Sequence, residues 1–369
     1  MTREYQATEL TGDYRSLVVS RTPLIDVRAP AEFKSGSIPG AVSLPLLTDE
    51  ERHLVGLTYR RQGRQTALNL ARDLVENEKK EMLTDIWSAY LKRHPDAVFY
   101  CARGGMRSAT AAGWAAQRTG STARRVKDGY KGFRTYLLSR LDPATITARP
   151  VLVGGRTGSG KTRLISRFAN SIDLEAIANH RGSSFGRFTT PQPGQADFEN
   201  RLAVALIRHG QAGFSHLILE DEGRHVGKRF LPRELSGFFT SGDLIVLEAP
   251  FEERVENIFR EYVIESQEQY GRNRPEAMWA WFEDMNRNID RIAKRLGSEL
   301  LGKVKALLES GCYHQEKNRD PEAHKHWIRL LLSHYYDPMY DYQLSRRDSK
   351  PVLEGRELVV IQYLRSLVP

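Results

Sequence analysis

The residues best suited to chemistry in this chain are a cysteine and two arginines in the segment Cys101-Ala-Arg-Gly-Gly-Met-Arg-Ser108. A buried apolar run precedes the cysteine like a strand, and the small residues that follow have the pattern of a helix with Ser108 near its cap. Cys101 is therefore expected where a strand leads into a helix N-terminus. Backbone N–H groups, the helix dipole, Arg103 and Arg107 would together favour the nucleophilic thiolate and an oxyanion beside it.

A second segment, Gly155-Arg-Thr-Gly-Ser-Gly-Lys-Thr162, fits the phosphate-binding pattern G-x-x-x-x-G-K-[ST]. It lies between a predicted strand and a predicted helix, which is the context that this pattern requires. Lys161 supplies a positive charge and the Thr162 hydroxyl can reach a metal ion. Three glycines let backbone N–H groups close around phosphate oxygens, namely Gly155, Gly158 and Gly160. The loop predicts binding of a di- or triphosphate and does not by itself require ATP.

Acidic residues end another apolar strand, expected at 216–220, in the order Glu220, Asp221 and Glu222. Such a cluster can hold Mg²⁺ or orient a nucleophile, and it can equally cap a helix or form ion pairs. The segment 180–186 carries Arg181 among glycines and serines. It is expected either to close over a bound phosphate or to serve as a connection, and a metal remains a candidate only.

Positive charge is concentrated around the cysteine loop. The formal net charge is +9, and residues 101–150 contain ten Lys or Arg against Asp128 and Asp142 alone. A solvated basic face would explain such a cluster, but around a reactive thiol the positive field favours a polyanionic substrate such as RNA. The candidate RNA-binding residues are Arg124, Arg125, Lys127, Lys131 and Arg134.

Composition predicts a soluble cytoplasmic protein of two or three domains without membrane contact. The 369 residues exceed one ordinary core. No apolar run approaches the roughly 20 residues of a membrane helix, and the N-terminus lacks a signal-peptide pattern. The two cysteines, Cys101 and Cys312, provide no disulfide framework. Cys312 lacks a setting comparable to that of Cys101, and we interpret it as incidental.

Alternating strand and helix patterns predict two α/β units with parallel sheets, each sheet built from short buried strands. Residues 66–93 have a long helical pattern, and a return strand is expected near 351–353 before a closing helix from Glu357. The predicted order is a first domain at 8–141, a linker at 142–150, a P-loop domain core at 151–251 and a mostly helical extension at 252–369.

The first domain resembles the rhodanese family. The resemblance rests on the position of the cysteine loop and on Leu24-Ile-Asp-Val-Arg28, Glu32-Phe33 and Gly36-Ser-Ile-Pro-Gly-Ala41. Sulfurtransferase loops of this family usually run C-x-x-G-x-R, whereas the interval from Cys101 to Arg107 is one residue longer, as in the cell-cycle phosphatases that share the fold. The longer loop makes room for a larger tetrahedral anion.

Over essentially its whole length the chain resembles the bacterial tRNA 2-selenouridine synthases. The resemblance rests on the order of the cysteine loop, the P-loop, the segment 180–186 and Tyr336-Asp-Pro-Met-Tyr-Asp-Tyr342, and residues 57–60 and 129–134 fit the same pattern. It implies a rhodanese-like α/β domain followed by a P-loop NTPase-like parallel-sheet domain with a largely helical C-terminal part. It also implies an enzyme that replaces the sulfur of wobble 2-thiouridine in tRNA with selenium from selenophosphate. The family is similar to enzymes that first transfer a geranyl group from geranyl diphosphate to that sulfur.

The resemblance divides the work between the two halves of the chain. The P-loop and Arg181 would hold the diphosphate of geranyl diphosphate, and Lys161 with Mg²⁺ would stabilise the departing pyrophosphate. Arg103 and Arg107 would bind selenophosphate, and Cys101 would either carry selenium or help to position its donor. The basic residues would hold the anticodon arm of tRNA. The implied partners are tRNA and the enzyme that makes selenophosphate, and no tightly bound cofactor is expected.

Three other functions fit parts of the sequence. A sulfurtransferase fused to an ATP-dependent kinase or ATPase would act on a small molecule and turn over ATP without RNA. An RNA-binding or regulatory protein with a vestigial loop is disfavoured because Cys101, Arg107, Lys161 and Thr162 are all intact. The hypothesis of a phosphatase rests on loop length alone, and Tyr100 occupies the position where that class often has histidine.

Overall fold

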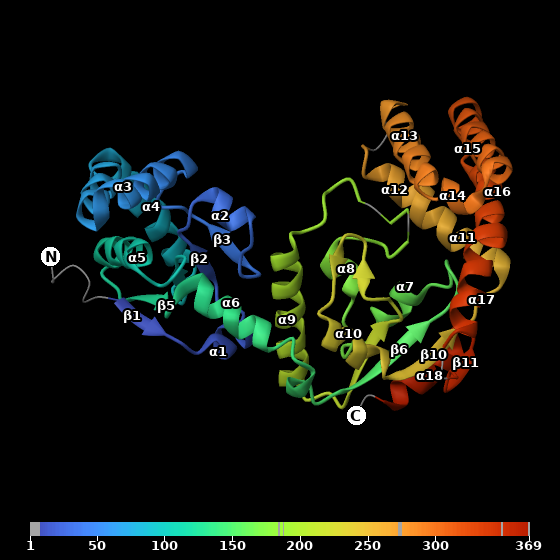
Figure 1. The fold of residues 1–369 in the computed structure, drawn as a ribbon, viewed down its shortest axis with the longest axis horizontal. Helices are drawn as coiled ribbons and strands as arrows, with labels where there is room; N and C mark the ends of the chain where they lie inside the picture. The colour runs from blue at the N-terminus through green and yellow to red at the C-terminus, as the bar shows by residue number, and fades with distance from the viewer. Residues whose placement is uncertain (1–7, 184, 187, 272–274, 348–349, 368–369) are drawn as a thin grey trace. The chain divides into compact units, whose positions relative to one another are not determined.

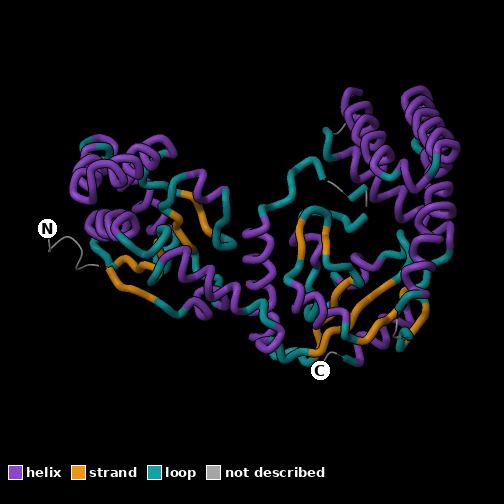
Figure 2. The backbone as a smooth tube through the Cα atoms, viewed as in Figure 1, coloured by secondary structure: helices purple, strands orange, loops and turns teal. Residues whose placement is uncertain are grey.

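The computed structural model describes residues 8–183, 185–186, 188–271, 275–347 and 350–367, and it divides into two compact units (Figure 1). The first unit comprises the described residues up to Ile146 together with 194–212, and the second comprises 147–193 and those from 213 onward. Each unit is an α/β structure with strands between helices (Figure 2), so the predicted fold class is confirmed.

The first unit is built on a parallel five-stranded sheet of order β1-β5-β4-β2-β3. Its strands are β1 (Thr8–Thr11), β2 (Leu24–Asp26), β3 (Ala41–Ser43), β4 (Val98–Tyr100) and β5 (Ala123–Val126). Every residue of β2 and β4 is buried. Helix α5 (Met106–Thr119) presents mostly alanines to the core, and their small side chains let the helix lie close to the sheet.

The other helical segments of this unit are α1 (Tyr14–Val19), α2 (Pro30–Lys34), α3 (Asp49–Asp73), α4 (Glu78–Arg93), α6 (Gly129–Ser139) and the 3₁₀ turn η1 (Pro143–Thr145). The single helix predicted at 66–93 is two helices with a break at 74–77. Helix α3 starts well before the predicted segment, because Thr48 and Glu51 form a reciprocal capping box at its N-terminus. It bends at Gly63, whose φ of 84° lies in the region that favours glycine.

Helix α9 (Gln195–Ala212) joins the first unit although its sequence lies beyond the P-loop. It packs against α1 and α6. Arg134 on α6 pairs with Glu199 and donates to the side-chain oxygen of Asn200 at 2.5 Å. Asp197 accepts the Ser37 N–H at 2.8 Å. The sequence placed this helix within the P-loop core at 151–251, and the packing groups it with the rhodanese-like unit.

The second unit is built on a parallel four-stranded sheet of order β11-β10-β6-β7. Its strands are β6 (Arg149–Gly154), β7 (His216–Glu220), β10 (Asp243–Leu247) and β11 (Leu353–Gly355). Strand β6 begins within the predicted linker at 142–150. The return strand expected near 351–353 pairs from Leu353 onward with β10, and the closing helix α18 (Glu357–Ser366) follows.

Smaller elements complete this sheet region: α7 (Lys161–Ile165), α8 (Leu174–Ala178), the antiparallel pair β8 (His225–Val226) and β9 (Arg229–Phe230), and α10 (Arg233–Thr240). The helical extension consists of α11 (Phe251–Phe259), α12 (Glu265–Glu268), α13 (Pro275–Arg291), α14 (Ala293–Leu296), α15 (Ser298–Asn318), η3 (Glu322–His324), α16 (Lys325–Leu331) and α17 (Asp337–Ser345). Two π-helical segments interrupt it, η2 (Arg260–Ile264) and η4 (Leu332–Tyr336).

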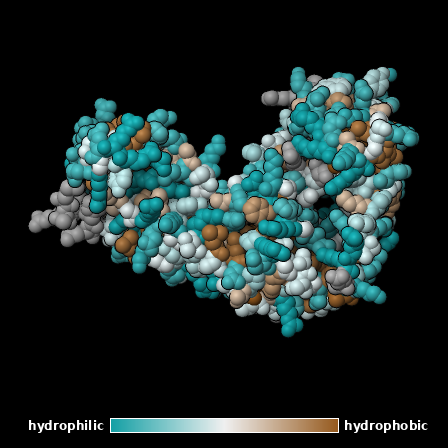
Figure 3. Space-filling view, viewed as in Figure 1, coloured by the Kyte–Doolittle hydropathy of each residue, from teal (hydrophilic) through white to brown (hydrophobic). Residues whose placement is uncertain are grey.

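The helical extension has an apolar core of its own, which includes Trp281, Met285 and Trp327. Cys312 lies in this core, and burial raises the pKa of its thiol to about 12. Within the described residues, none of the helices combines the length and hydrophobicity needed to cross a membrane. On the face drawn in Figure 3, hydrophilic side chains predominate and apolar ones gather in small groups.

Gly129, at the start of α6, provides a direct test of how the cysteine loop is held. Its φ is 56°, and a Cβ atom there would lie 2.2 Å from the Cys101 carbonyl oxygen. Gly129→Ala should therefore lower the free energy of unfolding by about 1–3 kcal/mol, measured by urea denaturation.

The matched control is Gly210→Ala on α9, where an added Cβ meets no atom within 4 Å. This change should stabilise the protein slightly, because alanine favours helix over glycine. Equal effects of the two substitutions would contradict the packing described for Gly129.

Candidate functional site

The cysteine loop lies at the carboxyl end of β4 and leads directly into α5. Helix α5 begins at Met106 with Gly105 as its N-cap, so Ser108 lies in the first turn rather than at the cap. The Ser108 hydroxyl donates to the Gly105 carbonyl at 3.1 Å and lies 3.3 Å from the Cys101 sulfur. Cys101 is 3% exposed, which places the thiol at the base of the loop.

The N-terminus of α6 fixes the loop from the other side. The Tyr130 N–H donates to the Cys101 carbonyl at 2.8 Å, and the Lys131 N–H donates to the Ala102 carbonyl at 3.0 Å. These bonds turn both loop carbonyls toward α6. The segment 129–134, noted in the sequence, is thus the support of the cysteine loop.

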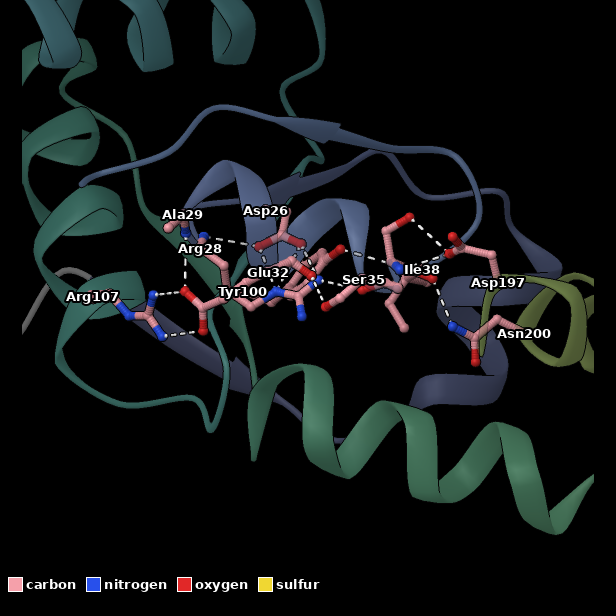
Figure 4. A network of polar contacts seen from close by, with 12 residues as sticks. Asp26, Arg28, Ala29, Glu32, Ser35, Ile38, Tyr100, Arg107, Asp197 and Asn200 are labelled. Carbon is pink, nitrogen blue, oxygen red and sulfur yellow. Dashed lines mark hydrogen bonds and ion pairs between the residues drawn. The ribbon is translucent and has the colours of Figure 1, made fainter. Parts of the chain in front are cut away.

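Arg107 is held by a carboxylate rather than left open to an anion (Figure 4). Its guanidinium donates to both oxygens of Glu32, at 2.5 and 3.1 Å, and Glu32 also accepts the Ala29 N–H. Burial opposes ionisation of Glu32, but Arg107 outweighs it and holds the pKa of the carboxyl below its ordinary value. Glu32 thus holds Arg107 at the start of α5, and direct contact between Arg107 and an anion stays a prediction. Arg103 is exposed at the loop and is the better placed ligand.

A buried ion pair underlies this arrangement. The Arg28 guanidinium donates to Asp26 at 2.6 Å and to the Gly36 carbonyl at 2.8 Å, and it stacks 3.9 Å from the centre of the Tyr130 ring. The Ile38 N–H donates to the Tyr100 hydroxyl at 3.3 Å. The sequence features that carried the rhodanese resemblance therefore tie β2 and the turn at 36–41 to the strand that carries Cys101.

The P-loop forms one wall of a cavity of about 860 Å³ in the second unit. The structure brings every predicted phosphate-site and acidic residue to this cavity: Gly155, Gly158, Gly160, Lys161, Thr162, Arg181, Glu220, Asp221 and Glu222. The Lys161 ammonium donates to the Gly155 carbonyl at 3.0 Å, which curls the lysine over the loop. A volume of this size suits a small-molecule substrate.

The helical extension braces the P-loop. Arg254 on α11 forms a bidentate ion pair with Asp337, with both distances 2.7 Å, and donates to the Thr157 carbonyl at 3.3 Å. Asn257 donates to the Gly158 carbonyl at 2.8 Å. Gly158 has a φ of 83°, and a Cβ there would lie 2.7 Å from the Arg254 carbonyl oxygen. The motif at 336–342 thus shapes the phosphate loop through Asp337.

A carboxylate cluster faces Lys161, and its membership differs from the predicted one. Glu175, Glu220 and Glu222 each offer an oxygen within 4.8 Å of the others. Asp221 instead pairs with Arg347. Burial, together with neighbouring carboxylates, raises the pKa of Glu175 to about 10, and burial raises that of Glu220 to about 7. The predicted acidic set is therefore corrected: Glu175 joins it and Asp221 leaves it.

The cluster fits a divalent cation of the Mg²⁺ type. Carboxylate and hydroxyl oxygens are the ligands that this ion prefers. The Thr162 hydroxyl lies 3.5 Å from a Glu175 oxygen, and one buried oxygen of Glu220 has no hydrogen-bond partner among the described residues. Glu175, Glu220 and Glu222 would hold the ion, and it would supply positive charge beside a bound diphosphate.

Arg181 lies at the cavity wall, held by Glu261 at 3.2 Å and by the ring of Phe188 at 4.3 Å. Its Nη1 is buried without a hydrogen-bond partner among the described residues, so it retains a donor. Ser183 bonds Tyr262 at 2.7 Å and anchors the same segment. Ser184, also part of that segment, lies outside the described residues.

The predicted RNA-binding residues differ in their exposure and in their contacts with other protein groups. Lys127 and Lys131 are exposed, and Arg124 is half-buried on β5. Arg125 donates to the Thr8 hydroxyl at 3.1 Å. Arg134 is occupied by Glu199 and Asn200 on α9, so we remove it from the RNA-binding set. Burial against a second helix was not visible from local sequence.

The roles of three residues at the P-loop site were not predicted from the sequence: Glu175 lines the cavity, and Arg254 and Asp337 brace the loop. Glu175 lies on the short helix α8 and has no local motif, so only the fold brings it to Lys161. Asp337 was part of the motif at 336–342, which signalled importance but no role. Arg254 belongs to no recognisable motif, and its partner Asp337 is far away in the sequence.

Comparisons with known protein families match the N-terminal and C-terminal parts of the chain separately. Residues 9–136 match the rhodanese-like domain model, and residues 148–368 match the model of the tRNA 2-selenouridine synthase AAA domain. Three relatives bear the name tRNA 2-selenouridine synthase. That from Sulfurovum sp. is 46% identical over 96% of this chain and 98% of its own length. Those from Cupriavidus pinatubonensis and Hydrogenovibrio crunogenus are 42% and 41% identical, over 97% and 96% of this chain and 98% of their own lengths.

The chain belongs to the tRNA 2-selenouridine synthase family. The resemblance inferred from the motifs is thereby confirmed over both units. Within this family's AAA domain, the present chain places the P-loop, the carboxylate cluster and the motif at 336–342 around one cavity.

Mg²⁺ should stabilise the protein through the carboxylate cluster, because the ion binds the cluster assembled in the folded state and not the separated carboxylates of the unfolded chain. At about a hundred times its dissociation constant, a bound ion adds about 2.7 kcal/mol to the free energy of unfolding. Thermal melting with and without Mg²⁺ should show this as a rise in Tm. Glu175→Gln should remove most of the rise, whereas the control Asp221→Asn should keep it. A rise that depends on Asp221 and not on Glu175 would contradict the corrected cluster.

Proposed function

We propose that this chain converts 2-thiouridine to 2-selenouridine in tRNA through S-geranylation and then selenium transfer. Membership of the tRNA 2-selenouridine synthase family over both units supports the overall conversion. The observation that favours two steps is the presence of two separately built sites, a cavity lined by the P-loop and a carboxylate cluster, and a cysteine loop at the N-terminus of α5.

In the first step, the thiouridine sulfur attacks C1 of geranyl diphosphate. The S–C bond forms, the C–O bond breaks, pyrophosphate leaves and the base loses its N3 proton. The P-loop amides, Lys161 and Arg181 would stabilise the charge that develops on the departing pyrophosphate. The apolar geranyl chain would lie against Ile258, Tyr336 and Met339, which line the same cavity.

Alkylation prepares the base for the second step, because a thiolate bearing a carbon chain leaves C2 more readily than a thiocarbonyl sulfur. The selenium of selenophosphate attacks C2, the C–S bond breaks, and geranylthiol departs with a proton. Water then cleaves the Se–P bond and releases phosphate. Arg103 and the amides at the start of α5 would bind the tetrahedral donor, and Cys101 lies at the base of that loop.

Reconstitution tests the overall conversion. Purified protein, tRNA containing 2-thiouridine, geranyl diphosphate, selenophosphate and Mg²⁺ should yield 2-selenouridine, detected by mass spectrometry of digested tRNA. If the digest contains neither the geranylated nor the selenated nucleoside, the proposal is refuted. ATP turnover without any RNA product would favour the alternative of a kinase or ATPase fused to a sulfurtransferase.

Two substitutions separate the proposed steps. Lys161→Ala should abolish geranylation, because the departing pyrophosphate loses its positive charge, while selenation of RNA that is already geranylated should persist. Cys101→Ser should keep geranylation, lose selenation and accumulate the geranylated nucleoside. If both variants lose both steps while their circular dichroism spectra stay native, this division of labour is wrong.

Binding of tRNA should weaken steeply with salt, because contacts between lysines and phosphates release counterions. In fluorescence anisotropy titrations, Lys127→Ala and Lys131→Ala should each lower the slope of log K against log salt by roughly one. Lys305→Ala, in the helical extension, is the control and should leave the slope unchanged. Salt-independent binding would argue against this surface as the tRNA site.

A further inference from the structure

Besides the P-loop cavity in the second unit, the structure has a large cavity in the first unit, of about 670 Å³. The two proposed reactions do not use it. Its walls come from α3 on both sides of the bend at Gly63 and from α5. The bend lets residues 52–60 and 68–75 face α5 together. A cavity of this volume falls in the range of ligand pockets, about 300–1,000 Å³.

The lining is mainly apolar, and part of it is exposed to solvent. Leu47, Val55, Leu68 and Trp114 are among the apolar residues that line it. Two others, Tyr59 and Met106, remain 59% and 40% exposed. Exposed apolar walls of this kind mark a binding site more often than a chance surface.

Charge at the same cavity has one sign. Arg52, Arg60, Arg72 and Arg107 line it, and no acidic residue does so among the described lining residues, although Arg107 is paired with Glu32 beside the cavity. The side chain of Arg52 is 54% exposed and lies 3.9 Å from Glu32. The cavity therefore suits a ligand with an apolar chain joined to an anionic body.

The cavity adjoins the cysteine loop. Met106 and Arg107, the first two residues of α5, follow the loop directly and line the cavity. Leu46, Leu47 and Val75 belong both to its lining and to the apolar cluster that contains Cys101. An apolar chain bound here would hold its attached base next to the loop that binds the selenium donor.

We propose that this cavity, which we term the α3–α5 pocket, binds the geranyl chain of S-geranyl-2-thiouridine in tRNA, with the exposed Arg52 and Arg60 facing the RNA phosphates. The inference rests on the proposed two-step function and adds a separate prenyl subsite for the second step. Free geranyl diphosphate has its own place at the P-loop, where its diphosphate meets Lys161 and the carboxylate cluster. The α3–α5 pocket thus recognises the intermediate after pyrophosphate has gone.

Gly56 offers a way to fill the pocket without disturbing its walls. It lies on α3, lines the pocket, and an added Cβ there would meet no atom within 4 Å. Gly56→Leu should therefore place a side chain in the pocket and also favour the helix. Gly210→Leu on α9 is the matched control, because an added Cβ there also meets open space outside the pocket.

The binding experiment uses an anticodon stem-loop RNA with either 2-thiouridine or its S-geranyl form. The protein should bind the geranylated RNA about tenfold or more tightly than the 2-thiouridine RNA, because several CH₂ groups leave water. Gly56→Leu should abolish this preference, and Gly210→Leu should retain it. Equal affinity of the unaltered protein for the two RNAs would overturn the proposal.

The activity experiment separates this inference from the proposed function. Gly56→Leu should still geranylate 2-thiouridine RNA but should lose selenation of geranylated RNA by at least about tenfold. If Gly56→Leu loses geranylation instead, the pocket serves geranyl diphosphate and the inference is wrong. If it matches the unaltered protein in both reactions, the pocket is not a prenyl subsite. If the unaltered protein performs neither reaction, it is the proposed function that fails.

Discussion

A charge buried without a partner is costly, and this cost determines how both sites are built. In the rhodanese-like unit the chain itself supplies the opposite charges, since Arg28 is paired with Asp26 and Arg107 with Glu32. At the carboxylate cluster of the P-loop unit the charges are not matched in this way, because Glu175, Glu220 and Glu222 all lie near Lys161. The first arrangement fixes a loop in place. The second raises the pKa of the carboxyl groups, so they hold protons that a bound cation would replace.

Because of this difference, the cysteine loop is held by contacts within the protein, whereas the P-loop cavity would be completed by a bound cation. The cysteine loop is complete as folded: its carbonyls bond α6 and its neighbouring arginine bonds Glu32. Arg103 is exposed beside it, where it would meet the anion that we propose. The P-loop cavity holds raised carboxyl pKa values, so its groups give up protons when a cation arrives. Within one chain, the proposed anion site at the cysteine loop is preformed, and the proposed phosphate site would depend on an ion.

Local motifs predicted the parts of the structure that depend on adjacent residues. The strand and glycine pattern of the P-loop and the strand before Cys101 are of this kind, and the closing strand needed only a short apolar run after a proline. Partnerships across long sequence distances were not accessible. Glu175 lies next to Lys161, Glu199 neutralises Arg134, and Asp337 holds Arg254, and each depends on topology that no local pattern encodes. The break between α3 and α4 was missed because both halves have similar helical periodicity.

The placement of α9 has a consequence for any attempt to dissect the protein genetically. The chain passes from one unit to the other at 146–147, returns at 193–194 and leaves again at 212–213. A truncation at the predicted linker 142–150 would remove the helix that packs against α1 and α6 and leave Arg134 without Glu199. Neither unit is a contiguous piece of sequence. Synthesis of the rhodanese-like unit is finished only after the ribosome has read through the P-loop, so its folding is coupled to that of its neighbour by chain connectivity.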